Sequence, residues 1–315
     1  MVPATGDVGL NDFVIWFNGG PGCSSLSGIL GEEGPVKMDP VTYVAKPNPY
    51  SWTNLTNMMW VDQPAGTGFS RGPALNQSME QVALDFNGFL LNLYKDFPKL
   101  RGKNLWLMGE SFAGKFIPYI AHQIYKNEKE NKLAGIHLKG IGMNDAFFYD
   151  NMIGKELPAV QFAQQNAKIM NLNQSDVDQL IRQGKEIGID TYVEDNLKYP
   201  PAGPFHVPEQ FNSSKSVYSS MKKMAKKANP CFSPFNILGP SPCPLDALGM
   251  DSTTEVSHKY NYFNRNPRVK TLIHADNVTY TECSQKKPFD IMKHSKTEFP
   301  VNTILPTVVE KSERT

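Results

Sequence analysis

The chain has 315 residues, of which 40% are hydrophobic and 20% charged, and its formal net charge is +1. This composition is typical of a folded protein, and it gives no electrostatic reason to expect nucleic acid or an anionic membrane as a partner. No apolar run approaches the ~20 residues that a membrane-spanning helix needs. Four clustered lysines are interpreted as a solvated helix face: Lys222, Lys223, Lys226 and Lys227.

Taken in chain order, short apolar runs alternate with amphipathic helices. Strands are predicted at residues 13–17 (FVIWF), 58–61, 105–108 and 136–143. Ser78 and Gln81 predict a capping box for a helix that Pro98 stops, with an apolar face of Val82, Phe86, Phe89, Leu90, Leu93 and Phe97. A second helix is predicted over 113–128, with Phe116, Ile117, Ile120 and Ile124 on one face. This order indicates an α/β fold whose mostly parallel sheet is covered by helices on both faces.

The amino-acid composition of the sequence changes after residue 150. Residues 151–250 are polar and contain many prolines and lysines, so we expect an inserted, mainly helical cap. Residues 1–150 then form the core, and 251–315 return to it with a short apolar element from Val269 to His274. The tail after Pro306 is expected to end a helix and lead into a further strand.

The cysteines and glycosylation sequons bear on the compartment. None of Cys23, Cys231, Cys243 and Cys283 forms a C-x-x-C pair, so we expect neither a metal nor a cofactor. Four cysteines allow two disulfides in three connectivities. Together with five sequons they favour the secretory route, vacuolar, lysosomal or extracellular; the sequon asparagines are Asn54, Asn76, Asn173, Asn212 and Asn277. The first residues lack the basic and apolar regions of a signal peptide, so the protein is either cytosolic or its true start is missing.

Two segments are candidate site elements. Residues 109–114 (GESFAG) lie between a predicted strand and a predicted helix and are interpreted as a G-x-S-x-G nucleophile elbow centred on Ser111. The alternative is a serine that caps the following helix. Residues 16–25 (WFNGGPGCSS) contain a Gly-Gly turn that can offer a backbone N–H to an oxyanion, or can be a tight turn without a ligand. Ser24 and Ser25 are expected to cap a helix rather than to act as nucleophiles.

Three segments resemble blocks of the serine carboxypeptidase family: WFNGGPGCSSL at 16–26, VDQPAGTGFS at 61–70 and GESFAGKFIPYIA at 109–121. Members of this family are α/β-hydrolases that remove single residues from the C-termini of peptides and proteins. The resemblance implies Ser111 as the nucleophile and the N–H groups of Gly20 and Phe112 as the oxyanion hole. It implies that Asn18 and Glu110, beside Trp16 and Gly19, hold the carboxylate of the substrate.

The resemblance has further consequences. A carboxyl group can hydrogen-bond to a bound carboxylate only when one of the two carries a proton, so we expect tightest peptide binding at acidic pH. Glu32 is either a member of this carboxylate site or a solvated loop charge. The family also implies a Cys23–Cys283 disulfide and a Cys231–Cys243 disulfide that closes a loop in the cap, the second contributing roughly 3 kcal/mol.

A triad acid and a triad histidine have no expected counterpart in the chain. A hydrolase of this fold takes both after the nucleophile. All six histidines are interpreted as structural or surface residues, with His122 exposed: His122, His137, His206, His258, His274 and His294. We therefore expect an internal fragment that is inactive alone and has unpaired edges at both sides of its sheet. Three functions remain open: a carboxypeptidase, a non-catalytic peptide-binding or partner-protecting relative, and a carboxypeptidase-like acyltransferase.

Overall fold

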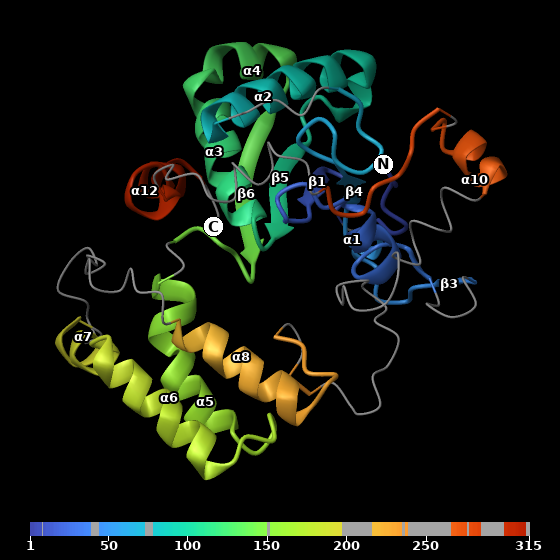
Figure 1. Ribbon diagram of the computed structural model, residues 1–315. Helices are drawn as coiled ribbons and strands as arrows, with labels where there is room; N and C mark the ends of the chain where they lie inside the picture. The colour runs from blue at the N-terminus through green and yellow to red at the C-terminus, as the bar shows by residue number, and fades with distance from the viewer. Residues whose placement is uncertain are drawn as a thin grey trace. The chain divides into compact units, whose positions relative to one another are not determined.

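The computed structural model describes residues 1–7, 9–38, 44–72, 78–149, 152–196, 216–234, 237–238, 266–275, 277–284 and 299–312. The chain divides into two compact units, which are described separately. Unit 1 comprises residues 1–148 with 247–315, and unit 2 comprises residues 149–246 (Figure 1).

Unit 1 is built around a parallel sheet of the order β4-β1-β5-β6. Its strands are β1 (Asp12–Phe17), β4 (Asn57–Trp60), β5 (Asn104–Glu110) and β6 (His137–Asn144), which confirms the predicted strands with shifts of a few residues at their ends. β1 lies between β4 and β5, and Phe17 is in register with Gly109. The carboxyl ends of β1 and β5 therefore meet, so the Gly-Gly turn and the elbow lie at the same edge of the sheet.

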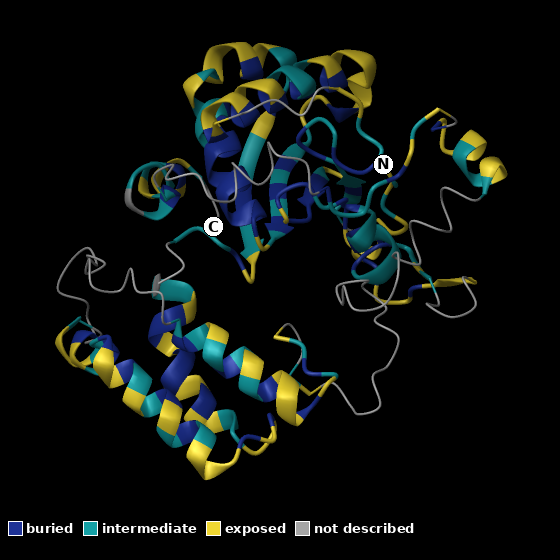
Figure 2. Cartoon of the chain, viewed as in Figure 1, coloured by how far each residue is buried: buried dark blue, intermediate teal, exposed yellow. Residues whose placement is uncertain are grey.

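Residues of β1 alternate between two apolar clusters, as the two-residue period of a strand requires. Phe13, Ile15 and Phe17 pack into the main core with α2 (Met79–Asp96) and α3 (Ala113–Lys126). Val14 and Trp16 belong to a smaller cluster on the other face. Figure 2 shows this buried centre beneath the exposed outer faces of the helices. Each fully buried large apolar side chain contributes about 1.5–3 kcal/mol to stability relative to an exposed one.

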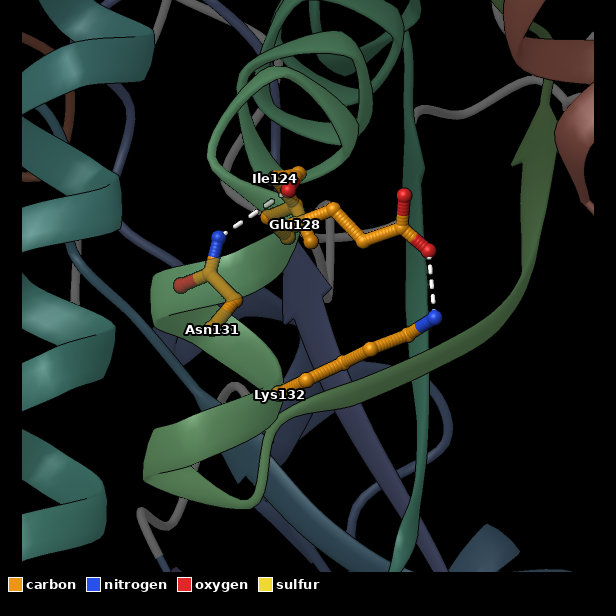
Figure 3. Close-up of polar contacts among 4 residues, drawn as sticks. All are labelled: Ile124, Glu128, Asn131 and Lys132. Carbon is orange, nitrogen blue, oxygen red and sulfur yellow. Dashed lines mark hydrogen bonds and ion pairs between the residues drawn. The ribbon is translucent and has the colours of Figure 1, made fainter.

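The helix predicted over 113–128 is confirmed as α3, and a short helix that was not predicted follows it. α3 ends at Lys126, and α4 (Glu128–Ala134) follows after Asn127. Asn131 of α4 is buried, and its Nδ2 donates to the carbonyl of Ile124 at 3.0 Å (Figure 3). The same Nδ2 donates to Oδ1 of Asn87 at 2.9 Å. This buried amide fixes the break, because it satisfies a carbonyl at the end of α3 from within the next helix.

The capping prediction for α2 is confirmed in part. Ser78 Oγ accepts from the backbone N–H of Gln81, but the Gln81 side chain donates to Asp85 rather than back to the N-cap. Phe97 was expected on the apolar face, yet it is the C-cap and 50% exposed. A complete capping box is found instead at Asn173 and Asp176.

Among its described residues, unit 1 contains eight further short elements. They are α1 (Leu26–Gly31), β2 (Val36–Met38), β3 (Ala45–Pro47), η1 (Trp52–Asn54), η2 (Pro98–Leu100), α10 (Pro267–Leu272), η5 (Pro300–Asn302) and α12 (Leu305–Lys311). α12 packs on α3 and ends in Ser312, which has an extended backbone. The apolar element expected near 269–274 is α10 and its C-cap, and no residue of α10 is buried.

The two outer strands of the described sheet differ. Val2 pairs antiparallel with Met58 through N–H···O bonds of 2.8 and 2.9 Å. An unpaired edge was expected on this side of the sheet, but β4 is paired at this residue. Among the described residues, β6 is the outermost strand on the other side.

Unit 2 is mainly helical. It contains η3 (Met152–Glu156), α5 (Leu157–Asn166), α6 (Gln174–Glu186), α7 (Ile189–Asn196) and α8 (Val217–Ala228) around a core that includes Val160, Leu180 and Met221. The polar face expected for α8 is present, since Lys223, Lys226 and Lys227 are exposed. In the described part of the chain, no helix combines the length and apolarity needed to cross a membrane.

Candidate active site

Ser111 sits on a sharp turn between β5 and α3. Its φ of 55° lies in the left-handed region, which a non-glycine residue adopts only at a cost. Backbone hydrogen bonds of Ser111 hold the turn. Its N–H donates to the carbonyl of Asn144 at 3.2 Å, and its carbonyl accepts from the N–H groups of Gly114 at 3.0 Å and Phe147 at 2.7 Å. This is the strand-turn-helix geometry expected of a nucleophile elbow.

Small residues make the turn sterically feasible. A Cβ on Gly109 would lie 2.4 Å from the carbonyl oxygen of Phe17, and one on Gly114 would lie 2.7 Å from the amide nitrogen of Phe147. The interpretation as G-x-S-x-G needs a correction, because Ala113 occupies the position of the second glycine and Gly114 follows it. Ala113 is fully buried, so a methyl group is accommodated there.

The Gly-Gly turn after β1 packs directly against the elbow. A Cβ on Gly19 would lie 2.6 Å from the amide nitrogen of Phe112 and 2.9 Å from Ser111 Oγ. Gly20 has a φ of 113°, which favours glycine. The structure thus brings together Gly19, Phe112 and Ser111; the role of the Gly20 and Phe112 N–H groups as an oxyanion hole stays a prediction.

Asn18 and Glu110 are adjacent across β1 and β5. Asn18 Oδ1 accepts from Trp16 Nε1 at 3.1 Å and from the N–H of Gly28 at 3.2 Å, which directs its Nδ2 toward Glu110 Oε1 at 2.7 Å. Burial raises the pKa of Glu110, the hydrogen bond from Asn18 opposes this, and the charge of Asp145 raises it further.

Glu33 is a member of this cluster that the sequence analysis missed. Its side chain is buried, and its Oε1 accepts from Trp60 Nε1 at 2.6 Å. Burial is the main cause that raises the pKa of Glu33 and the charge of Glu110 adds to it, while hydrogen bonds with Trp60, its own backbone and Glu32 lower it. Glu32 therefore contacts the cluster through Glu33. The doubled Glu32-Glu33 was the only sequence signal, and it did not distinguish the two.

Asp62 is a second residue that the sequence analysis did not single out. Its Oδ1 accepts from Ser24 Oγ at 2.7 Å and from the N–H of Ser25 at 2.8 Å, and its Oδ2 accepts from the N–H of Phe69 at 2.9 Å. Burial raises its pKa, and these three hydrogen bonds oppose the rise. The carboxylate ties the segment after the Gly-Gly turn to the 61–70 segment.

Ser24 and Ser25 serve the same connection. Ser25 is the N-cap residue of α1 but caps no N–H with its side chain; its Oγ donates to the carbonyl of Val61 at 2.7 Å and accepts from the N–H of Asn18 at 3.1 Å. Ser24 Oγ donates to Asp62 and accepts from the N–H of Leu26 at 3.2 Å. Both serines position the turn, and neither lies in a nucleophile elbow.

Lys115 is a buried cation one helical turn beyond Ser111. It is 1% exposed, and its Nζ lies 5.5 Å from the ring centroid of Phe112, 5.7 Å from that of Phe147 and 4.3 Å from that of Phe299. Cation–π contacts of this kind are worth about 0.5–2 kcal/mol. The lysine thereby links the elbow to the C-terminal segment of unit 1, a contact that no local pattern signals.

The Cys23–Cys283 disulfide is present, as the family resemblance implied. The strand-like contact around it includes a hydrogen bond from Ser24 N–H to the carbonyl of Glu282 at 2.7 Å, so residues 282–284 lie beside the Gly-Gly turn. Cys231 is also disulfide-bonded, and its expected partner Cys243 lies outside the described residues.

The histidines that the structure describes lie away from the elbow turn itself. His122 is on α3, partly buried rather than exposed, and burial, Lys126 and Lys311 lower its pKa. His137 begins β6, at the opposite end of the parallel strands from Ser111, and His274 follows α10. His206, His258 and His294 lie outside the described residues.

Other predicted positions have no part in this geometry. Asn54, Asn173 and Asn277 are exposed, while Asn76 and Asn212 lie outside the described residues. Across the residues whose positions are described, no group of three or more His, Cys, Asp or Glu side chains could hold a metal ion.

The sequence model of the serine carboxypeptidase family matches residues 1–315. The chain belongs to this family. Serine-type carboxypeptidase F of Aspergillus niger is 36% identical to it over 325 residues, which cover 97% of this chain and 59% of that protein. A carboxypeptidase Y homolog of Arthroderma benhamiae is 33% identical over 305 residues, covering 97% of this chain and 59% of the relative.

A solved carboxypeptidase structure supports the fold. The prohormone-processing carboxypeptidase Kex1 of Saccharomyces cerevisiae superimposes with a TM-score of 0.64 at 24% identity, over 89% of this chain and 59% of Kex1. The chain thus has the α/β-hydrolase-type fold expected from its sequence. It spans about three fifths of the length of the serine carboxypeptidases it matches.

Proposed function

We propose that the protein is a serine-type carboxypeptidase that releases C-terminal residues from peptides and proteins. The observation that carries this proposal is the left-handed turn at Ser111, packed against the Gly-Gly turn, next to the Asn18–Glu110 pair. Family membership supports a peptidase of the same class.

In the proposed reaction, Ser111 Oγ attacks the carbonyl carbon of the last peptide bond. The N–H groups of Gly20 and Phe112 stabilise the oxyanion, and the N-terminal end of α3 adds a favourable dipole. A general base accepts the Oγ proton and passes it to the leaving amine as the peptide C–N bond breaks, and water then hydrolyses the acyl-enzyme to the shortened peptide and free Ser111. Without an adjacent base the serine hydroxyl is a weak nucleophile.

Asn18 and Glu110 are proposed to bind the C-terminal carboxylate of the substrate. Burial already raises the pKa of Glu110, and a bound anion raises it further, so Glu110 holds the proton that the carboxyl–carboxylate hydrogen bond requires more tightly than an exposed glutamate would. Gly19 allows the Gly-Gly turn to pack directly against the elbow, because a Cβ there would lie 2.6 Å from the amide nitrogen of Phe112.

We further propose that residues 1–315 alone do not turn over peptides, and that a base and an acid outside this chain complete the site. Among the described histidines, which are His122, His137 and His274, none is hydrogen-bonded to Ser111. The full-length protein is proposed to follow the secretory route, where the Cys23–Cys283 disulfide can form.

A fluorophosphonate probe tests both parts of the proposal. The full-length protein should be labelled at Ser111 and should release C-terminal residues from a peptide fastest at acidic pH, and Ser111→Ala should abolish both. Residues 1–315 should be labelled far more slowly. Absence of label and of release from a folded full-length protein would refute the proposal in favour of a non-catalytic relative.

A further inference from the structure

Unit 2 contains a cavity of about 200 Å³ that the proposed reaction does not use. Its walls come from α5, α8 and the segment after α8, and include Pro158, Ala159, Phe162, Met221, Phe232 and Ile237. All of these side chains are apolar. Since an apolar cavity of roughly 150 Å³ binds benzene, this one has room for an aromatic ring or a branched aliphatic group.

The rim of the cavity is positively charged. Lys155 and Tyr218 also line the cavity, and Lys155 Nζ lies 6.0 Å from the centroid of the Tyr218 ring. Lys222 Nζ lies 4.7 Å from the same centroid. Two ammonium groups therefore flank one aromatic ring beside an apolar interior.

The carboxylate that follows Lys155 in the chain makes its hydrogen bonds elsewhere. Glu156 is buried and is directed at the N-terminus of α8: its Oε1 accepts from Ser216 Oγ, and its Oε2 accepts from the N–H of Tyr218 at 3.1 Å. Hydrogen bonds to a helix N-terminus occupy both oxygens. Lys155 itself is exposed.

We infer that this cavity binds an aryl or alkyl carboxylate, with the apolar group inside and the carboxylate near Lys155 and Lys222. Two sources share this chemistry: a free small acid, and the C-terminal residue of a peptide with an apolar side chain. The inference uses residues of unit 2 alone and is independent of the proposed activity at Ser111.

The test uses the full chain labelled with ¹³C at its methionine methyl groups. Met221 lines the cavity and is the reporter, while Met58, fully buried in β4, is the reference. Titration with 3-phenylpropionate should shift the Met221 signal to saturation and leave that of Met58 unchanged. The neutral isostere 3-phenylpropanamide should bind about two- to five-fold more weakly, as expected for loss of an exposed ion pair.

Two variants and a pair of peptides complete the experiment. Ala159→Leu fills the cavity and should abolish the shift; Lys155→Gln, at an exposed position where folding is retained, should remove the preference for the acid over the amide. Gly-Gly-Phe with a free C-terminus should shift Met221 more strongly than its amidated form if peptides are the source, whereas a response to 3-phenylpropionate alone identifies a free acid. No shift of Met221 with any probe, or equal affinity for acid and amide, would overturn the inference.

Discussion

Replacing Asp62 tests whether a single buried carboxylate holds the Gly-Gly turn in place. Asp62→Ala removes the acceptor of three hydrogen bonds, from Ser24 Oγ, Ser25 N–H and Phe69 N–H. A buried donor left without an acceptor costs about 1–3 kcal/mol. The wild-type carboxylate also carries a desolvation cost, which its raised pKa reveals. The alanine variant recovers that cost, so we expect a net loss of about 3–5 kcal/mol in the free energy of unfolding.

Asp62→Asn distinguishes the contributions of the hydrogen bonds to Oδ1 from that of the hydrogen bond to Oδ2. Ser24 and Ser25 both donate to Oδ1, whereas Phe69 donates to Oδ2. An asparagine oxygen at the Oδ1 position keeps two of the three bonds, so this variant should lose less stability than Asp62→Ala. Fluorophosphonate labelling of Ser111 in the full-length protein should likewise fall less in Asp62→Asn than in Asp62→Ala.

Urea unfolding followed by tryptophan fluorescence measures these differences. Asp96→Ala is the matched control, because Asp96 is exposed at the end of α2 and its loss should change stability by no more than about 0.5 kcal/mol. The reasoning would be refuted if Asp62→Ala were as stable as Asp96→Ala, or if Asp62→Asn were the more destabilised of the two Asp62 variants.

Three further predictions follow from the same region. Gly19→Ala should reduce Ser111 labelling in the full-length protein by more than about tenfold, because its Cβ would lie 2.9 Å from Ser111 Oγ; Gly88→Ala, with open space around its Cβ, is the control and should label normally. Burial raises the pKa of the Glu33 and Glu110 carboxyls above the ordinary 4.5, so the folded state binds their protons more tightly. The stabilisation that this tighter proton binding provides is complete below pH 4.5 and is lost as pH rises through the pKa values of the folded state. Urea midpoints measured at several pH values should therefore decline with pH, and Glu33→Gln should make this decline shallower. A decline of unchanged steepness in Glu33→Gln would contradict the prediction. Cys283→Ala opens a disulfide between residues 260 positions apart and should cost about 2–5 kcal/mol, measured against the wild type under non-reducing conditions; equal stability would count against a structural role.

The sequence alone determined the features that depend on local patterns. The four apolar runs predicted β1, β4, β5 and β6, because buried parallel strands need continuous apolar residues. The helix faces with Phe116, Ile117, Ile120 and Ile124 were confirmed as buried, because residues three and four apart share one side of a helix. The turn at Ser111 was likewise predictable, since a serine among small residues between a strand and a helix is a local signal.

Errors occurred where a local pattern had two readings. The sequence predicted the helix over 113–128 but not the short helix α4 that follows it, which is tied to the end of α3 and to α2 by the buried amide of Asn131. Phe97 has the spacing of the apolar face of α2, yet it lies at the C-cap, where the helix ends and the side chain is exposed.

The tertiary structure alone decided which polar side chains meet. Whether Glu32 or Glu33 is buried depends on the position of Trp60, 27 residues away from Glu33 in the chain. The roles of Asp62 and Lys115 depend on Ser24 and Phe299, which adjoin them only after β1, β4 and β5 have paired and α12 has packed on α3. Periodicity records which face of an element is apolar, but a hydrogen bond or a cation–π contact requires two distant segments to come within a few ångströms, and the packing of the sheet and its helices sets that distance.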